Sequence, residues 1–120
     1  MLVADTSIWV DHFRKGNTVL TALLGDGVVA MHPFIVGELA CGNLKAREAI
    51  LQEFQALPQV QTATNAEVLY LIESRRLWGR GLGWTDMHLL ASTILSGFGL
   101  WTLDVRLQKA ADELGVAGLL

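Results

Sequence analysis

Four acidic residues of this sequence lie beside apolar segments rather than on charged stretches. Asp5 and Asp104 each come directly after a short apolar run. Glu38 lies inside another apolar stretch, and Asp86 stands just before one. Taken singly, an aspartate at such a point suits a helix N-cap, and a glutamate suits an exposed position on a helix. Each residue on its own leaves that structural interpretation open.

If the fold brings the four carboxylates together, they indicate a cation-binding site instead. Converging carboxylates repel one another, and such groups are kept mainly where a cation neutralises them. The three histidines are scattered and cysteine occurs once, so the ligand spacing typical of zinc is missing from the sequence. Oxygen ligands alone favour Mg²⁺ or Mn²⁺. A cation held in this way would polarise a phosphodiester and lower the pKa of a bound water.

Short apolar runs alternate with helical patterns along the chain. Residues 2–4, 28–31 and 100–103 are predicted to be buried strands, and residues 116–120 an edge strand. This alternation predicts an α/β fold in a single domain over residues 1–120. We expect a central parallel sheet of about four to five short strands with helices on both faces. Ligands of such sheets bind beyond the carboxyl ends of the strands, which is where Asp5 and Asp104 would stand.

Capping residues mark where several helices begin. Asn17 is predicted to cap a short helix, and Thr64 has the spacing of a capping box with Glu67. Thr85 is predicted to cap a helix that runs from Asp86 to about residue 96. Residues 44–57 have the apolar spacing of a further amphipathic helix.

The composition excludes several classes of protein. The chain has 120 residues, is 52% hydrophobic and carries a formal net charge of −3, so it is neither disordered nor a cationic binder of phosphates. No apolar run approaches the ~20 residues of a membrane span, and no basic leader precedes an apolar run. The single cysteine, Cys41, fits a reducing cytoplasm. A protein of this composition would have to act on nucleic acid through a local site or a bound metal.

Four ordered stretches make the chain resemble the PIN-domain family and, within it, the toxin branch named VapC. In chain order these stretches are VADTSIW at residues 3–9, IVGEL at 35–39, DMHLLA at 86–91 and WTLDVRL at 101–107. None is specific alone, but their order and spacing fit from end to end.

The resemblance implies a metal-dependent endoribonuclease that uses Mg²⁺ or Mn²⁺ and is the toxin of a type II toxin–antitoxin pair. It further implies a cytoplasmic homodimer that cleaves RNA and is neutralised by a small antitoxin. The metal and catalytic site would consist of Asp5, Glu38, Asp86 and Asp104. Ser7 and Thr102 would orient carboxylates or waters around it. Many relatives carry further acids just past the fourth position, where this chain continues with VRL, so direct or water-mediated contact of Asp104 with the metal stays open.

Two further features have competing interpretations. Arg75, Arg76 and Arg80 surround a glycine-rich stretch ahead of Asp86. They either contact RNA phosphates or form a solvated helix end. Trp84 either stacks on a base or packs in the core, and we expect core packing.

Two other classes of protein do not fit the sequence. A receiver domain would need an acidic pair after the first strand and a late lysine after a strand, and both are missing from the sequence. A flap-type DNA nuclease would need more chain than 120 residues. The remaining alternative is a catalytically silent PIN module that acts as a protein-interaction scaffold.

Overall fold

The computed structural model describes residues 1–119, in which a three-stranded parallel sheet stands at the centre. The strand order is β2-β1-β3, with β1 (Leu2–Ala4) in the middle, β2 (Val29–Ala30) on one side and β3 (Gly99–Trp101) on the other. Val3 is in register with Ala30 and with Leu100. All three strands are parallel, so their carboxyl ends lie at the same edge. The expected α/β class with a parallel sheet is confirmed.

The expected number of strands, four to five, is wrong for the described residues. Residues 116–119 form only an isolated bridge, between Ala117 and Leu100, and Leu120 lies outside the described residues. A second isolated bridge joins Met31 to Gln59 beyond the opposite edge. Both segments therefore lie where an edge strand would lie, but each pairs with its neighbour through a single bridge. The proline before Gln59 has no N–H to donate, which limits pairing there.

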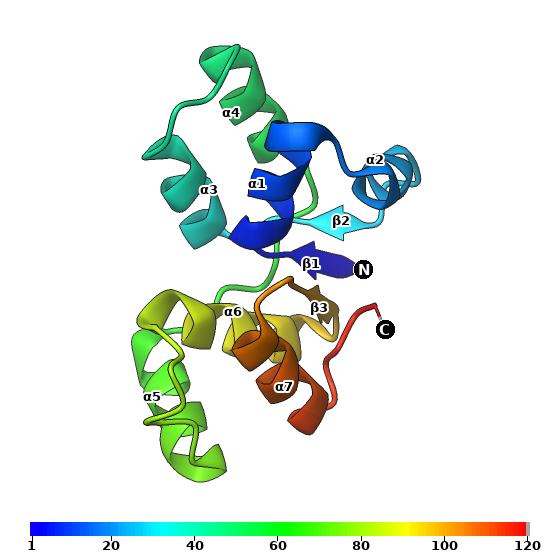
Figure 1. The fold of residues 1–120 in the computed structure, drawn as a ribbon. Coiled ribbons are helices and arrows are strands. Elements are labelled where there is room, and N and C mark those ends of the chain that lie inside the picture. Colours follow the sequence, from blue (N-terminus) through cyan, green and yellow to red (C-terminus); the bar gives the residue numbers. More distant parts are fainter. Residues whose placement is uncertain (120) are drawn as a thin grey trace.

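Helices make up most of the remaining chain and lie on both sides of the strands. In Figure 1, α1 to α4 lie on one side and α5 to α7 on the other. The helices are α1 (Thr6–Lys15), α2 (Thr18–Gly25), α3 (Pro33–Ala40), α4 (Arg47–Ala56), α5 (Asn65–Arg75), α6 (Trp84–Ser96) and α7 (Val105–Glu113).

Side-chain caps place most helix starts where the sequence predicts them. Asn17 caps α2, and Thr64 and Glu67 form the expected capping box of α5. Two boundaries differ. Gly83, not Thr85, is the N-cap of α6, so that helix takes in Trp84. The helix expected over residues 44–57 is shorter, because α4 begins only at Arg47, behind Ala46 in the left-handed conformation.

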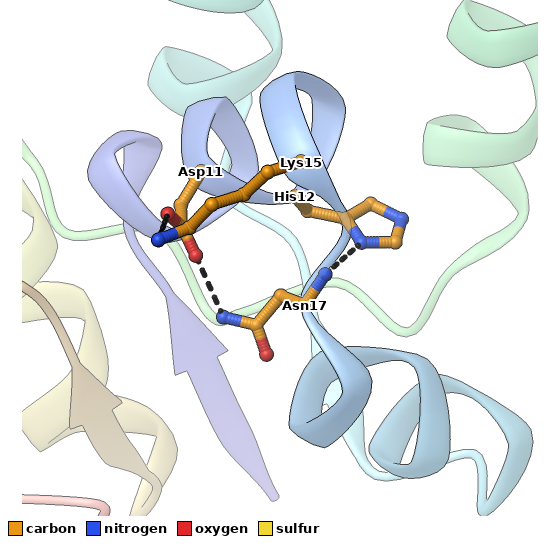
Figure 2. A network of polar contacts seen from close by, with 4 residues as sticks. All are labelled: Asp11, His12, Lys15 and Asn17. Atoms are coloured by element: carbon orange, nitrogen blue, oxygen red, sulfur yellow. Dashed lines mark hydrogen bonds and ion pairs between the residues drawn. The ribbon is translucent and has the colours of Figure 1, made fainter.

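The junction between α1 and α2 is joined by side chains, as Figure 2 shows. Asn17 donates from Nδ2 to Asp11 over 3.2 Å, and its backbone N–H donates to Nδ1 of His12 over 3.2 Å. Lys15 pairs with Asp11 one turn earlier. The same asparagine caps α2 through its Oδ1. Asn17 therefore begins α2 and at the same time binds two side chains of α1, whose C-cap is Gly16.

The buried side chains of the strands and helices form one contiguous cluster. It runs from Val3 in β1 to Ala111 in α7 and includes the fully buried Ile8, Ile35 and Leu107. None of the helices in residues 1–119 combines the length and the apolar character that crossing a membrane requires. The packed elements thus hold the carboxyl edge of the sheet in a defined shape.

Candidate active site

Asp5 is the buried centre of the polar residues at the carboxyl edge of the sheet. It follows the central strand directly, and only 6% of its surface is exposed. Its Oδ1 accepts hydrogen bonds from Ser7 Oγ and the Ile8 N–H, and its Oδ2 accepts one from Thr102 Oγ1. Burial raises the pKa of Asp5, while the two hydroxyls and the Ile8 N–H counteract that rise. Asp5 is thus both the N-cap of α1 and a buried carboxylate.

The two hydroxyls connect Asp5 to the loop that follows β3. Ser7 Oγ accepts the Leu103 N–H over 3.0 Å, and Thr102 Oγ1 accepts the Asp104 N–H over 3.0 Å. Each hydroxyl therefore donates to Asp5 and accepts from the loop. These contacts are of the kind expected from residues that orient a carboxylate.

Glu38 reaches the same edge from α3. Its Oε1 accepts a hydrogen bond from Thr6 Oγ1 over 3.0 Å, and Thr6 is the next residue after Asp5. Glu38 is exposed. A hydroxyl therefore connects its helix to the first residue of α1.

Asp104 and Asp86 each bind an N–H of their own helix start with one carboxylate oxygen. Oδ1 of Asp104 accepts from the N–H groups of Arg106 and Leu107, and Oδ2 of Asp86 accepts from the Gly83 N–H over 2.9 Å. The other oxygen of each carboxylate accepts no hydrogen bond from any residue in the range 1–119. The interpretation as a helix N-cap is therefore correct for Asp104, whereas Asp86 is the third residue of α6 and bonds back to its N-cap, Gly83.

Chain direction explains why these carboxylates share one edge. Helices α1, α3 and α7 each follow a strand, so they begin at its carboxyl end. Helix α6 turns at Gly97, which has a φ of 69°, packs against β3 and leads into it, so its first turn points back toward the same edge. Asp5, Glu38 and Asp104 are further connected by the bonds through Thr6 and Thr102. Asp86 lies at this edge because α6 runs antiparallel to β3, so the first turn of the helix is near the carboxyl end of the strand.

The donor set suits a hard divalent cation, since it consists of carboxylate oxygens alone. In the range 1–119, however, no three acidic, histidine or cysteine side chains come close enough together to hold a metal ion. The chemistry of the carboxylates fits Mg²⁺ or Mn²⁺. As placed, these side chains lie along one edge of the sheet and do not converge on a single point.

Comparison with known proteins identifies the family. Residues 2–113 match the PIN domain. The chain is also 46% identical over 118 residues to a protein named Ribonuclease VapC32 from Mycobacterium tuberculosis, in strains CDC 1551 and H37Rv. That alignment covers 98% of this chain and 95% of the relative. The chain belongs to the PIN-domain family. Its similarity to the VapC branch, expected from the four sequence stretches, is confirmed.

Arg75 and Arg80 of this PIN domain bind Glu113 instead of the four acids of the candidate site. Arg80 forms an ion pair with Glu113 over 2.8 Å, and Arg75 donates to the carbonyl of the same residue over 3.4 Å. The hydrogen bond from Arg80 lowers the pKa of Glu113. Glu113 ends α7, whereas Asp104 caps its start. Contact of these arginines, or of the exposed Arg76, with RNA stays a prediction.

His32 joins two helices of the site, although the sequence did not mark it as a site residue. Its Nδ1 accepts the Phe34 N–H over 2.9 Å at the start of α3, so its Nε2 carries the proton and donates to Ser92 Oγ in α6 over 3.1 Å. Burial lowers the pKa of His32 to about 4, which keeps the ring neutral near pH 7. The bond connects the helix of Glu38 to the helix of Asp86. The only signal in the sequence is the position of His32 before Pro33, where a helix cap belongs.

Arg106 and a groove beside Glu38 were also overlooked. Arg106 is exposed two residues after Asp104 and lies against Gly81, where an added Cβ would meet its Nη1 at 2.5 Å. The groove has a volume of about 310 Å³ and runs between α1 and α3. It is lined by Thr6, Val10, Phe13, Arg14, Glu38 and Leu39, and by the turn at residues 42–44. The groove forms only when α1 and α3 pack together, so no local sequence pattern could have predicted it.

Proposed function

We propose that this PIN domain is a Mg²⁺-dependent endoribonuclease and the toxin of a type II toxin–antitoxin pair. The observation that carries the proposal is the buried Asp5 carboxylate, hydrogen-bonded by Ser7 and Thr102 at an edge that three other acids share. The 46% identity to a protein named as a ribonuclease supports the same reading. Nothing among residues 1–119 favours the alternative of a silent scaffold.

Each residue of the site has a stated part in this proposal. Asp5, Glu38, Asp86 and Asp104 would hold the cation, with Asp104 in direct or water-mediated contact. When bound, the cation supplies Lewis-acid polarisation of the scissile phosphate and lowers the pKa of a water. Ser7 and Thr102 hold the Asp5 carboxylate in one orientation, and their hydrogen bonds lower its pKa against the larger effect of burial, which raises it. In hydrolysis the attacking water would lose a proton to solvent and form a bond to phosphorus, while the bond to the leaving ribose oxygen breaks and that oxygen takes up a proton from solvent.

Two protein partners belong to the proposal. A small antitoxin would place an apolar segment in the groove beside Glu38, where Val10 and Phe13 are each 41% exposed. A second copy of the chain would cover α5 and α6, where Leu69, Tyr70 and Ile94 are exposed around an apolar hollow of about 460 Å³. Large apolar patches of this kind usually mark interfaces. The proposal also places the protein in the cytoplasm, because a free, exposed cysteine such as Cys41 suits a reducing compartment.

A cleavage assay with single-stranded RNA tests the proposed function. We expect the purified protein to cut RNA with Mg²⁺ or Mn²⁺ and to stop when chelator is added in excess. Asp5→Asn should abolish cleavage, because it removes a buried carboxylate. Asp26→Asn is the matched control, since Asp26 is exposed at the end of α2, just before β2 begins, whereas the four acids lie at the carboxyl edge of the sheet.

Two results of this assay would contradict the proposal. Cleavage that persists in excess chelator, in both wild type and Asp26→Asn but not in Asp5→Asn, would remove the metal from the mechanism. Equal cleavage by Asp5→Asn and wild type would show that the activity comes from a contaminating nuclease or from another site.

A further inference from the structure

Trp84 is an exposed aromatic ring at the acidic edge of the sheet. It is the first residue of α6 and stands two residues ahead of Asp86. Its exposed fraction is 43%, whereas Trp9 in the core is 3% exposed. The expectation that Trp84 packs in the core is therefore wrong for nearly half of its surface. A ring of this size left in water is typical of a surface that binds something.

The ring of Trp84 is supported from behind by two other rings. It meets His88 in a T-shaped contact, with centroids 4.5 Å apart and planes at 81°. His88 in turn lies 4.4 Å from Phe34 of α3. His88 is 2% exposed, and neither of its ring nitrogens has a hydrogen-bond partner within residues 1–119. It therefore packs as an aromatic spacer that keeps the Trp84 ring in place.

The charges around Trp84 favour a base over a phosphate as its partner. The chain carries a net charge of −3, and the edge beside Trp84 holds four carboxylates, so bulk attraction of RNA phosphates is weak. A nucleobase is uncharged, and stacking on an aromatic side chain contributes about 1–3 kcal/mol per base. The exposed Arg106, which lies against Gly81 in the loop before α6, supplies a positive charge for the neighbouring phosphate.

We infer that Trp84 is the stacking platform for one unpaired base of the RNA next to the scissile phosphate. The inference rests on the proposed ribonuclease function and adds a site for the base to it. It requires the substrate to be single-stranded at that position, because a paired base stacks on its neighbours in the duplex.

Cleavage kinetics with variants of two exposed tryptophans test this inference. The substrates are end-labelled single-stranded RNA homopolymers of A, C and U, with Mg²⁺ present. We expect Trp84→Ala to raise KM about 5- to 150-fold, as loss of one stacked base predicts, with kcat largely kept. Trp84→Phe should retain most of the affinity because it keeps an aromatic face. Trp78→Ala is the matched control, since Trp78 is 55% exposed in the connection between α5 and α6.

Two readouts distinguish stacking from a merely structural role. The salt dependence of RNA binding should be the same in Trp84→Ala and wild type, since a stacked base releases no counterions. Tryptophan fluorescence should be quenched by RNA in Trp78→Phe and should lose that quenching in Trp84→Phe. A structural defect would instead lower kcat and the melting temperature, and phenylalanine would not restore KM.

The outcomes also separate this inference from the proposed function. If wild type cleaves RNA and Trp84→Ala has an unchanged KM, the inference is overturned and the exposed ring is assigned to a protein partner. If RNA quenches Trp84 but is not cleaved, the stacking site stands and the ribonuclease proposal falls. If wild type neither binds nor cleaves any of the three RNAs, both are overturned.

Discussion

Replacing Thr102 with valine removes the hydroxyl that joins Asp5 to the loop of Asp104. Thr102 Oγ1 donates to Asp5 Oδ2 and accepts the Asp104 N–H. Valine keeps nearly the same shape, so the change removes one charge-assisted hydrogen bond from a buried carboxylate. Such a bond contributes about 1.5–3 kcal/mol. Asp104 is exposed, so its N–H can bind water instead and adds little to the loss.

We therefore expect Thr102→Val to lower the melting temperature at neutral pH by about 6–12 °C for a chain of this length. Metal affinity should fall about 10- to 100-fold, as is typical when a residue that orients a metal ligand is removed. Melting curves in chelator measure the first effect, and titration of RNA cleavage with Mg²⁺ measures the second.

The pH dependence of the stability loss follows from the pKa of Asp5. The Thr102 bond lowers this pKa, so the valine variant has the higher pKa in the folded state. The full difference in unfolding free energy is present where Asp5 is ionised in both proteins. It narrows as the pH falls through the two folded-state pKa values, because a protonated Asp5 no longer accepts a charge-assisted bond. Burial already raises the pKa of Asp5 in wild type, so the narrowing begins above the usual range of an aspartate.

Two control variants make the result interpretable. Thr102→Ser keeps the hydroxyl and should keep the metal affinity. Thr93→Val makes the same replacement at a fully buried threonine whose Oγ1 has no partner in residues 1–119, so it should leave stability unchanged or raise it. If Thr102→Val and Thr93→Val melt alike, or if the stability loss of Thr102→Val does not vary with pH, the assigned role of Thr102 is wrong.

Two further predictions concern surfaces away from Asp5. Replacing both Arg75 and Arg76 with alanine should weaken RNA binding. If each arginine contacts one phosphate of a single strand, the slope of the logarithm of the binding constant against the logarithm of the salt concentration should become less steep by about 1.4. An unchanged slope would mean that both arginines belong to a solvated helix end. Light scattering at micromolar concentration should show that the wild type is a dimer. Tyr70 is 75% exposed on α5, and Tyr70→Glu should shift the protein to a monomer because a charge would be buried in the interface. A monomeric wild type would contradict the proposed dimer.

Local signals in the sequence were sufficient for the central strands and for most helix starts. An apolar run followed by a capping residue specifies a buried strand and the helix after it, which is why β1 and the helix start at Asp5 were expected correctly. Asp104 caps α7, but β3 is Gly99–Trp101 and not residues 100–103, so Asp104 does not follow the strand directly. The N-caps at Asn17 and Thr64 were equally readable, because a cap and its N–H partner are three residues apart. Such short-range interactions depend little on the rest of the fold.

The edges of the sheet and the start of α6 depended on more than local pattern. Residues 116–119 are apolar enough for a strand, yet they pair with β3 at one point only. The extent of this pairing depends on the path by which the C-terminal segment returns to the sheet after α7. Thr85 is a good capping residue, but Gly83 starts the helix, so Trp84 lies in its first turn and contacts His88, which in turn contacts Phe34. The local preference of a threonine therefore did not decide where α6 begins.

The identity of the acidic residues and their places after strands or at helix starts were determined by the sequence alone. Only the tertiary structure decided which partners each acid has. Thr102 reaches Asp5 across 97 positions of the chain, and Thr6 reaches Glu38 across 32. It also turned Arg80 toward Glu113 and left Trp84 in solvent. The reason is physical: caps and periodicity act over a few residues, whereas hydrogen bonds and burial between distant segments exist only after the strands have paired and the helices have packed.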